Sequence, residues 1–167
     1  APMPSLFDTL QLGPITLENR LVMAPMTRGR ATEANVPTSR MATYYAQRAT
    51  GGLLITEGTQ ISPQAVGWYR APGIWTDEMT EAWKPVPEAV HRGGGRIFLQ
   101  LWHMGRVSHP DFQDGELPVG PSAIAAAGQS HTPQGPRDYV TPRELEAAEL
   151  PGIVADFVRG AKNAIAA

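Results

Sequence analysis

The stretch Leu21-Val22-Met23-Ala24-Pro25-Met26 decides the fold. It is a short apolar run without alternating polar residues, which is typical of a strand buried on both faces of a parallel sheet. Two later runs have the same character, namely Leu53-Leu54-Ile55-Thr56 and Arg96-Ile97-Phe98-Leu99-Gln100-Leu101-Trp102. The sequence therefore predicts an α/β protein with three neighbouring parallel strands.

Helical segments separate these strands. Residues 38–49 are good helix formers and end just before a glycine pair, which can adopt the left-handed cap. Residues 77–91 predict a second helix, because Thr76 is a suitable N-cap and two carboxylates follow it at the positive end of the helix dipole. Pro85 and Pro87 lack an amide proton, and each would cost about 3 kcal/mol inside a helix. We therefore expect a kink or a restarted helix at these prolines.

The flanking segments have their own patterns. Residues 6–21 predict a small β-hairpin around Gly13-Pro14. Residues 107–140 are rich in Gly, Pro, Ser and Ala and far exceed the usual βα loop of about 2–6 residues, so we interpret them as a loop on the active-site side. Thr141-Pro142-Arg143-Glu144 resembles a capping box and predicts a helix start. Residues 153–165 carry apolar side chains at helical spacing, which predicts an amphipathic helix over the sheet.

Three strands of this kind do not close into a barrel. Alternating strands and helices imply right-handed crossovers and a parallel sheet that must be covered or closed. A (β/α)8 TIM barrel needs about eight units and about 250 residues. We therefore expect residues 1–167 to be the N-terminal part of a single (β/α)8 barrel domain without an internal boundary. This part holds a hairpin and about three βα units, and another chain or fragment completes the barrel.

Composition narrows the class of protein. Apolar residues make up 42% and charged residues 18% of the chain, as in ordinary globular domains. The net charge of -2, without a basic stripe, gives no reason to expect nucleic acid as a partner. No apolar run approaches the about 18 residues that span a bilayer, so we expect no membrane association. The chain has no cysteine, which excludes disulfides and thiolate chemistry and favours a cytoplasmic location.

Candidate functional groups lie where the predicted strands end. In a (β/α) barrel the active site is at the carboxyl ends of the strands, which are here residues 24–27, Thr56-Glu57-Gly58 and Gln100-Leu101-Trp102. A lyase or aldolase would need a lysine or a metal cluster at these ends, and they have neither. The four histidines lack the spacing of metal ligands, so we expect no metal site.

These strand ends resemble the old yellow enzyme family of FMN-dependent ene-reductases, and the plant 12-oxophytodienoate reductases within it. The resemblance covers nearly the whole chain in order and approximate spacing. Five further motifs carry it: Glu18-Asn19-Arg20, Ala71-Pro72-Gly73-Ile74-Trp75-Thr76, Glu81-Ala82-Trp83-Lys84-Pro85, Leu101-Trp102-His103-Met104-Gly105-Arg106 and Pro121-Ser122-Ala123-Ile124. Several long motifs in register are far more specific than one short motif.

The resemblance implies a flavin contact along the first strand end. Four residues would line the isoalloxazine ring: Ala24, Pro25, Met26 and Thr27. The Thr27 hydroxyl would bond near the flavin O4 and tune the flavin, because a donor there stabilises the charge gained on reduction. Thr27 is thus the one residue given a catalytic role. The alternative is a strand-end threonine that bonds a nearby backbone group.

Four more positions follow from the resemblance. Gly58 would let the backbone approach the flavin, although it could be a simple turn glycine. Gln100, expected inside a buried strand, would bond the pyrimidine edge of the flavin or else a backbone group. Tyr69 and Trp102 would border the substrate pocket, or merely pack. Glu57 receives no role, because a charged residue at a barrel rim is more often salt-bridged than catalytic.

The function implied is that of part of an enzyme. An ene-reductase of this family takes hydride from NADPH or NADH through non-covalent FMN and reduces the activated C=C bond of an enone. The residues that bind the substrate carbonyl, the tyrosine proton donor and the arginines that hold the flavin phosphate all follow later strands, beyond this sequence. A second polypeptide is therefore the expected partner. The alternative is a non-catalytic half-barrel that serves as an assembly or binding module.

Overall fold

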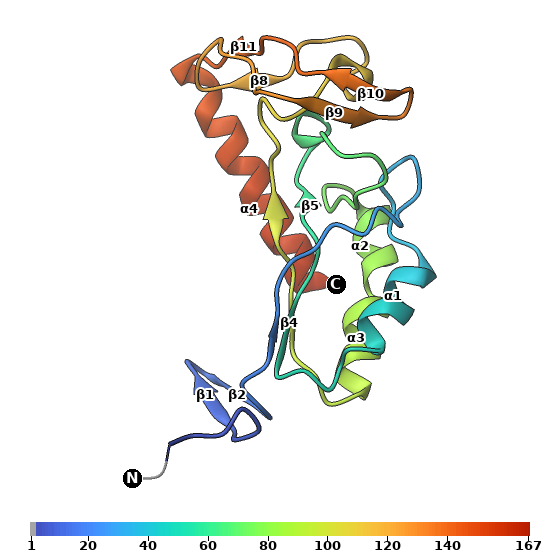
Figure 1. The fold of residues 1–167 in the computed structure, drawn as a ribbon, viewed down its shortest axis with the longest axis vertical. Coiled ribbons are helices and arrows are strands. Elements are labelled where there is room, and N and C mark those ends of the chain that lie inside the picture. The colour runs from blue at the N-terminus through green and yellow to red at the C-terminus, as the bar shows by residue number, and fades with distance from the viewer. Residues whose placement is uncertain (1–2) are drawn as a thin grey trace.

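The computed structural model describes residues 3–167 and confirms a parallel sheet. Strands β3 (Val22–Met23), β4 (Leu53–Ile55) and β6 (Ile97–Phe98) pair in parallel in the order β3-β4-β6. Strands β5 (Thr59–Gln60) and β7 (Leu101–Trp102) form a second parallel pair beyond β4 and β6 (Figure 1). The three predicted strands thus exist; the third is interrupted once, and β5 follows the second beyond its predicted end.

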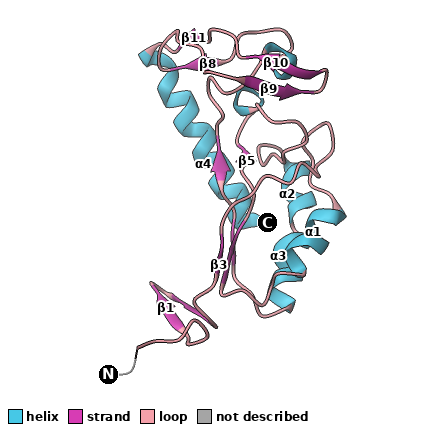
Figure 2. Cartoon of the chain, in the orientation of Figure 1, coloured by secondary structure: helices cyan, strands magenta, loops and turns pink. Residues whose placement is uncertain are grey.

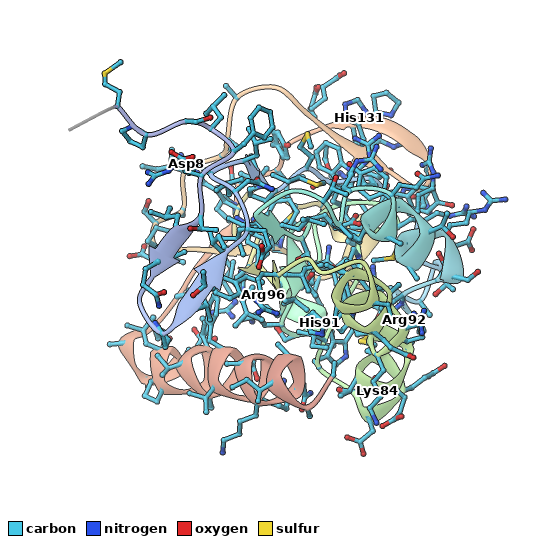
Figure 3. All side chains as sticks on the ribbon, turned by 90° about the horizontal axis from the view of Figure 1, so that it is seen from below. Asp8, Lys84, His91, Arg92, Arg96 and His131 are labelled. Atoms are coloured by element: carbon cyan, nitrogen blue, oxygen red, sulfur yellow. The ribbon has the colours of Figure 1, made fainter. Side chains whose placement is uncertain are left out.

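The helices follow these strands in the predicted order. Helix α1 (Ser39–Ala46) follows β3, α2 (Asp77–Trp83) and α3 (Pro85–Arg92) follow β5, and α4 (Leu150–Ala166) comes last. They flank the strands in Figure 2, and in the view along the strands α4, α3 and α1 lie on an arc outside them (Figure 3). None of the helices in residues 3–167 is long and apolar enough to cross a membrane.

The prolines of the second helical segment restart the helix, as the sequence predicts. Helix α2 begins at the N-cap Thr76, whose Oγ1 accepts the Met79 N–H at 3.1 Å, and it ends at Trp83. Helix α3 starts directly after Lys84 with Pro85 in its first turn, where a missing N–H costs nothing because those amides have no intrahelical acceptor. Trp83 of α2 and Val86 and Val90 of α3 join the same core on either side of the break at Lys84.

One apolar core lies between the sheet and helices α1 to α3. Its buried members come from the sheet, the three helices and three loops: Ala31, Met41, Tyr45, Ala49, Leu54, Ile74, Trp83, Val86 and Val90. The opposite face of the strands is not covered, since Val22 is 52% and Phe98 50% exposed. The prediction that the first strand is buried on both faces is therefore wrong for this chain, which covers one face only.

The third strand is interrupted rather than continuous. Thr56 Oγ1 accepts the Gln100 N–H at 3.0 Å, so a side chain replaces a backbone acceptor of the ladder. Pairing resumes where Thr59 N–H donates to the Gln100 carbonyl oxygen at 2.8 Å. Between these paired portions the second strand has more residues than the third. The third strand, which the sequence predicts as continuous, therefore divides into β6 and β7.

The segment between β7 and α4, residues 107–149, is called the excursion here. The sequence predicts a loop on the active-site side over residues 107–140, and the segment does lie on the side of the strand ends, but it is not a loop throughout. It contains the antiparallel hairpin β9 (Gln129–Thr132) and β10 (Gly135–Asp138), and the parallel pair β8 (Val119–Gly120) and β11 (Arg143–Glu144). Short 3-10 turns stand at η1 (Pro63–Ala65), which precedes the excursion, and within it at η2 (Pro110–Phe112) and η3 (Ala147–Glu149).

The predicted helix start at Thr141 is also wrong. Arg143 N–H donates to the Pro118 carbonyl oxygen and Leu145 N–H to that of Gly120, so this stretch is extended beside β8. The capping box is instead formed by Glu146 and Glu149, one turn before α4. The local pattern pointed to a helix, and pairing with a distant strand overrode it.

The N-terminal hairpin is confirmed. Strands β1 (Leu10–Leu12) and β2 (Ile15–Leu17) pair antiparallel around Gly13, which has a positive φ of 54°. The hairpin and the excursion lie at opposite ends of the strands (Figure 1). Asn19, after the hairpin, accepts the Gly52 N–H through Oδ1 at 2.9 Å and donates to the Thr50 carbonyl oxygen at 2.8 Å. This side chain thus ties the hairpin to the start of β4.

Candidate functional site

The carboxyl ends of the three parallel strands meet at one edge of the sheet, on the side of the excursion. We call residues 24–28 after β3, 56–58 after β4 and 99–100 after β6 the strand ends. Strands that are parallel and adjacent have their carboxyl ends at the same edge, which is where barrel enzymes place their chemistry. The sheet topology therefore brings together the three segments that the sequence singled out.

Side chains of the middle strand end bond both neighbouring strand ends. Glu57 Oε2 accepts the Arg28 N–H at 3.0 Å, which links the first and second strand ends. Thr56 Oγ1 accepts the Gln100 N–H and donates to the Glu57 carbonyl oxygen at 2.9 Å. Both Thr56 and Glu57 are buried. The three strand ends are thus one hydrogen-bonded unit.

The first strand end presents free polar groups. Ala24, Pro25 and Met26 are exposed and Thr27 is half-buried. Within residues 3–167, the Thr27 hydroxyl group has no hydrogen-bond partner, so the alternative of a threonine that bonds nearby backbone is not what this chain adopts. The hydroxyl and the neighbouring amides are available to a ligand lying on the uncovered face of the strands.

Gln100 differs from its predicted setting. It was expected inside a buried strand, where an amide without a partner would be costly. Instead it lies in the break between β6 and β7 and is exposed. Its backbone is fully paired with Thr56 and Thr59, while its side-chain amide has no partner among the residues described. The alternative of a backbone partner for this amide is thus not observed, and the amide can serve a ligand.

Gly58 faces an aromatic ring of this chain. A Cβ atom built on Gly58 would lie 2.0 Å from Trp102 Cε3, so the indole ring rests directly on the glycine backbone. The need for glycine at this position is therefore explained by Trp102. The approach of a flavin to Gly58 remains a prediction, and the face occupied by the indole is not free for it.

Tyr69 lies in a separate cavity. Its hydroxyl group donates to Glu33 Oε1 at 2.9 Å, and Arg70 bonds the same oxygen at 3.0 Å. A cavity of about 440 Å³ is bordered there by several aromatic side chains from the loop between β5 and α2 and from the excursion: Trp68, Tyr69, Trp75 and Phe112. Trp102 is not among its lining residues, so in this chain the two predicted pocket aromatics do not share a cavity.

Glu57 is the residue that sequence reasoning passed over. It was expected to form a salt bridge, but in residues 3–167 no basic nitrogen lies within salt-bridge distance of its carboxylate, which is fully buried. Burial raises the pKa of Glu57, while hydrogen bonds from the Arg28 amide and the Tyr45 hydroxyl oppose that shift. A charged residue flanked by buried strand residues was the available clue.

The donor set fits a flat, acceptor-rich heterocycle. The exposed strand-end backbone, the Thr27 hydroxyl and the Gln100 amide all belong to adjacent strand ends, and an isoalloxazine ring presents carbonyl and nitrogen acceptors along one edge. Three arginine side chains, those of Arg28, Arg30 and Arg40, line a cavity of about 170 Å³ together with Glu57 beside the first strand end. The arrangement can therefore offer hydrogen-bond donors to a planar ring at this edge of the sheet.

Comparison with known proteins places the chain in a family. Residues 5–167 match the model of the NADH:flavin oxidoreductase / NADH oxidase family, and the chain belongs to this family. It is 48% identical over 164 residues to 12-oxophytodienoate reductase 1 of Oryza sativa subsp. japonica, covering 97% of this chain and 42% of that protein. The resemblance inferred from the strand-end motifs is confirmed.

Solved structures agree. The old yellow enzyme homologue from Zymomonas mobilis superposes with a TM-score of 0.95 and 50% identity, over 98% of this chain and 46% of that one. Morphinone reductase in complex with tetrahydroNAD gives a TM-score of 0.91 and 50% identity, over 97% and 46%. The chain spans less than half the length of the relatives it matches. FMN and a reduced nicotinamide, the predicted cofactors, are those of this family.

Proposed function

We propose that this chain forms the ring-binding side of an FMN-dependent ene-reductase that uses NADPH or NADH to reduce the activated C=C bond of α,β-unsaturated carbonyl compounds. The observation that carries the proposal is the set of three hydrogen-bonded strand ends with free donors on their uncovered face. Similarity to 12-oxophytodienoate and morphinone reductases supports the substrate class. When bound, FMN would supply hydride acceptance from the nicotinamide and hydride donation to the β-carbon.

The residues of this chain would bind and orient the ring. Thr27 would donate a hydrogen bond from its hydroxyl group to an acceptor on the flavin and stabilise negative charge there. Residues 24–26 would contact the ring through the backbone, and the Gln100 amide would bond its pyrimidine edge. Trp102, resting on Gly58, and Tyr69 would border the substrate space, with Trp102 placed next to the strand ends.

A second polypeptide that carries the remaining barrel strands completes the proposal. Strands β3 and β6 are sheet edges in this chain, and the apolar side chains of Val22, Met26 and Phe98 are about half exposed on or near them. Such edges and apolar surface are unfavourable in water and favour pairing with further strands. Residues 1–167 would then be one continuous portion of a single barrel domain in the cytoplasm.

The proposal is tested by purifying the protein from its source and recording its intact mass and visible absorbance. We expect a flavin absorbance band, a second polypeptide that carries the remaining strands, and consumption of NADPH or NADH that depends on an enone such as cyclohexenone. The variant Thr27→Val keeps the shape of the side chain but removes its hydroxyl group, and it should lower the rate of flavin reduction. A colourless protein that binds no added FMN would refute the proposal that the chain is part of an enzyme. The alternative of a non-catalytic half-barrel module would then stand.

A further inference from the structure

The Glu57 carboxyl group has an unusual environment for a charged residue. Its side chain is fully buried, and its hydrogen-bond partners are the Tyr45 hydroxyl and the Arg28 amide. Burying a carboxyl group is costly unless its oxygens are bonded. The carboxyl group therefore has a hydrogen-bonding role at this position that an apolar side chain of the same size could not fill.

One carboxyl oxygen anchors the second strand end to helix α1. The Tyr45 hydroxyl donates to Glu57 Oε1 at 3.3 Å and accepts the Glu57 N–H at 2.7 Å, so the two residues form a closed pair. Tyr45 is itself fully buried in the core on α1. The phenol thereby fixes both the backbone and the carboxyl group of Glu57 relative to a rigid helix.

The other oxygen holds the first strand end. Glu57 Oε2 accepts the N–H of Arg28, the residue that follows Thr27. Strand β3 ends at Met23, and Gly29 then turns the chain with a φ of 60°. In the part of the chain that the structure describes, no other backbone amide in residues 24–28 forms a hydrogen bond. Within residues 24–28 the Arg28 amide is therefore the one amide bonded to the neighbouring strand, and the next amide, that of Gly29, also acts on the Glu57 carboxylate.

We propose that Glu57 and Tyr45 are positioning residues that fix the Thr27–Arg28 peptide through the Glu57 carboxyl group and so aim the Thr27 hydroxyl at the flavin. The inference rests on the proposed function, because it assigns Thr27 a flavin to face. A peptide held through one carboxyl group between strand and turn can rotate when that group is lost. A hydroxyl group on the preceding residue then loses its fixed direction.

The test compares four variants of the flavin-loaded protein. Glu57→Leu removes both acceptors at similar volume, Tyr45→Phe removes the hydroxyl that orients the carboxyl group, and Glu57→Gln keeps an oxygen that can accept the Arg28 N–H. Val90→Ala is the control, because it weakens the same core without touching the strand ends. The readouts are the dissociation constant of FMN and the midpoint potential of the bound flavin, with thermal unfolding measured in parallel.

We expect Glu57→Leu and Tyr45→Phe to bind FMN about tenfold more weakly and to favour the oxidised flavin over the reduced flavin by a further factor of about ten, which is about 30 mV for a two-electron couple. Glu57→Gln should stay within about twofold of the parent, because it retains the acceptor. Val90→Ala should lose thermal stability with an unchanged potential.

The inference is overturned if Glu57→Leu and Tyr45→Phe match Val90→Ala in FMN affinity and flavin potential, since both residues would then serve stability alone. It is also overturned if Glu57→Gln changes the potential as much as Glu57→Leu, because charge rather than the anchored peptide would then be the cause. Failure of the proposed function is distinguishable from both results, since the unsubstituted protein would then bind no FMN.

Discussion

The strand ends and the excursion lie close together in the fold, yet different forces hold them. At the strand ends the bonding side chains of Thr56, Glu57 and Thr59 are buried at 2% exposure or less. In the excursion the bonds between charged or amide side chains are at the surface, as between Arg143 and Glu149 or Gln129 and Asp138, while the buried hydroxyl groups of Ser108 and Thr132 bond below it. Buried bonds are costly to break, while exposed bonds compete with water. The strand ends are thus part of the core, and the excursion is laid over it with a combination of buried and exposed bonds.

The largest effect is expected at Gly58. A Cβ atom there would overlap the Trp102 ring, so Gly58→Ala must displace the indole or the backbone. We expect a loss of about 3 kcal/mol or more in the free energy of unfolding, measured by urea denaturation. The matched control is Gly152→Ala in α4, which has open space around it and should gain up to about 1 kcal/mol through helix propensity. Equal effects of both substitutions would contradict the close packing of Trp102.

The second largest effect is expected at Thr56. Thr56→Val keeps the side-chain shape but removes the acceptor of the Gln100 N–H and the donor to the Glu57 carbonyl oxygen. Leaving buried groups unpaired should cost about 1–3 kcal/mol, and hydrogen exchange at the Gln100 amide should become faster. Thr80→Val is the control, because the Thr80 hydroxyl bonds only its own helix at Thr76. Unchanged exchange at Gln100 would show that the third strand end is held by something else.

The two regions should also respond oppositely to pH. Burial raises the pKa of Glu57, so its contribution to stability is present at low pH and is lost as the pH rises from the ordinary carboxyl value of 4.5 through the higher folded pKa. The hydrogen bond with Arg143 lowers the pKa of Glu149 to about 2, so its contribution is present above the ordinary value and is lost as the pH falls. The measurement is urea unfolding between acid and neutral pH, with Glu57→Gln and Glu149→Gln each subtracted from the parent. Slopes of equal sign would contradict the assignment.

The smallest effect is expected in the excursion. Arg143→Ala removes a two-point bond to Glu149 that joins β11 to the turn before α4, with distances of 2.8 Å for both contacts. Both side chains are partly exposed, so we expect a change of about 0.5 kcal/mol or less, which should shrink further at high salt. A loss comparable to that of Gly58→Ala would mean that the excursion is as integral to the fold as the strand ends.

Local patterns were sufficient for the elements that depend on nearby residues. The hairpin around Gly13, the three strands and the restart of the helix at Pro85 were all predicted, because turn glycines, apolar runs and prolines act within a few residues. The family was also predicted from the strand-end motifs, and the comparisons confirm it. The roles of Thr27, Gly58 and Gln100 toward a flavin remain predictions that the variants above can test.

Where the sequence misled, pairing between distant residues was the cause. Residues 141–144 have the composition of a helix start, but Arg143 pairs with Val119 and adopts a strand. Gln100 belongs to an apolar run, yet its N–H donates to the hydroxyl group of Thr56, 44 residues earlier, and this divides the run in two. Neither of these pairing partners, Val119 or Thr56, can be recognised from a single sequence, because local composition does not indicate which strand lies beside which.

By itself, the sequence determined the class of fold, the family and the segments in which the candidate site lies, because strand periodicity, helix signals and motif order are local properties. Only the tertiary structure decided that Glu57 is a buried anchor, that Trp102 covers Gly58 and that Tyr69 lies in a cavity of its own. The physical reason is that burial and hydrogen-bond partnership are set by neighbours in space, which in each of these cases come from another strand, helix or loop of the chain.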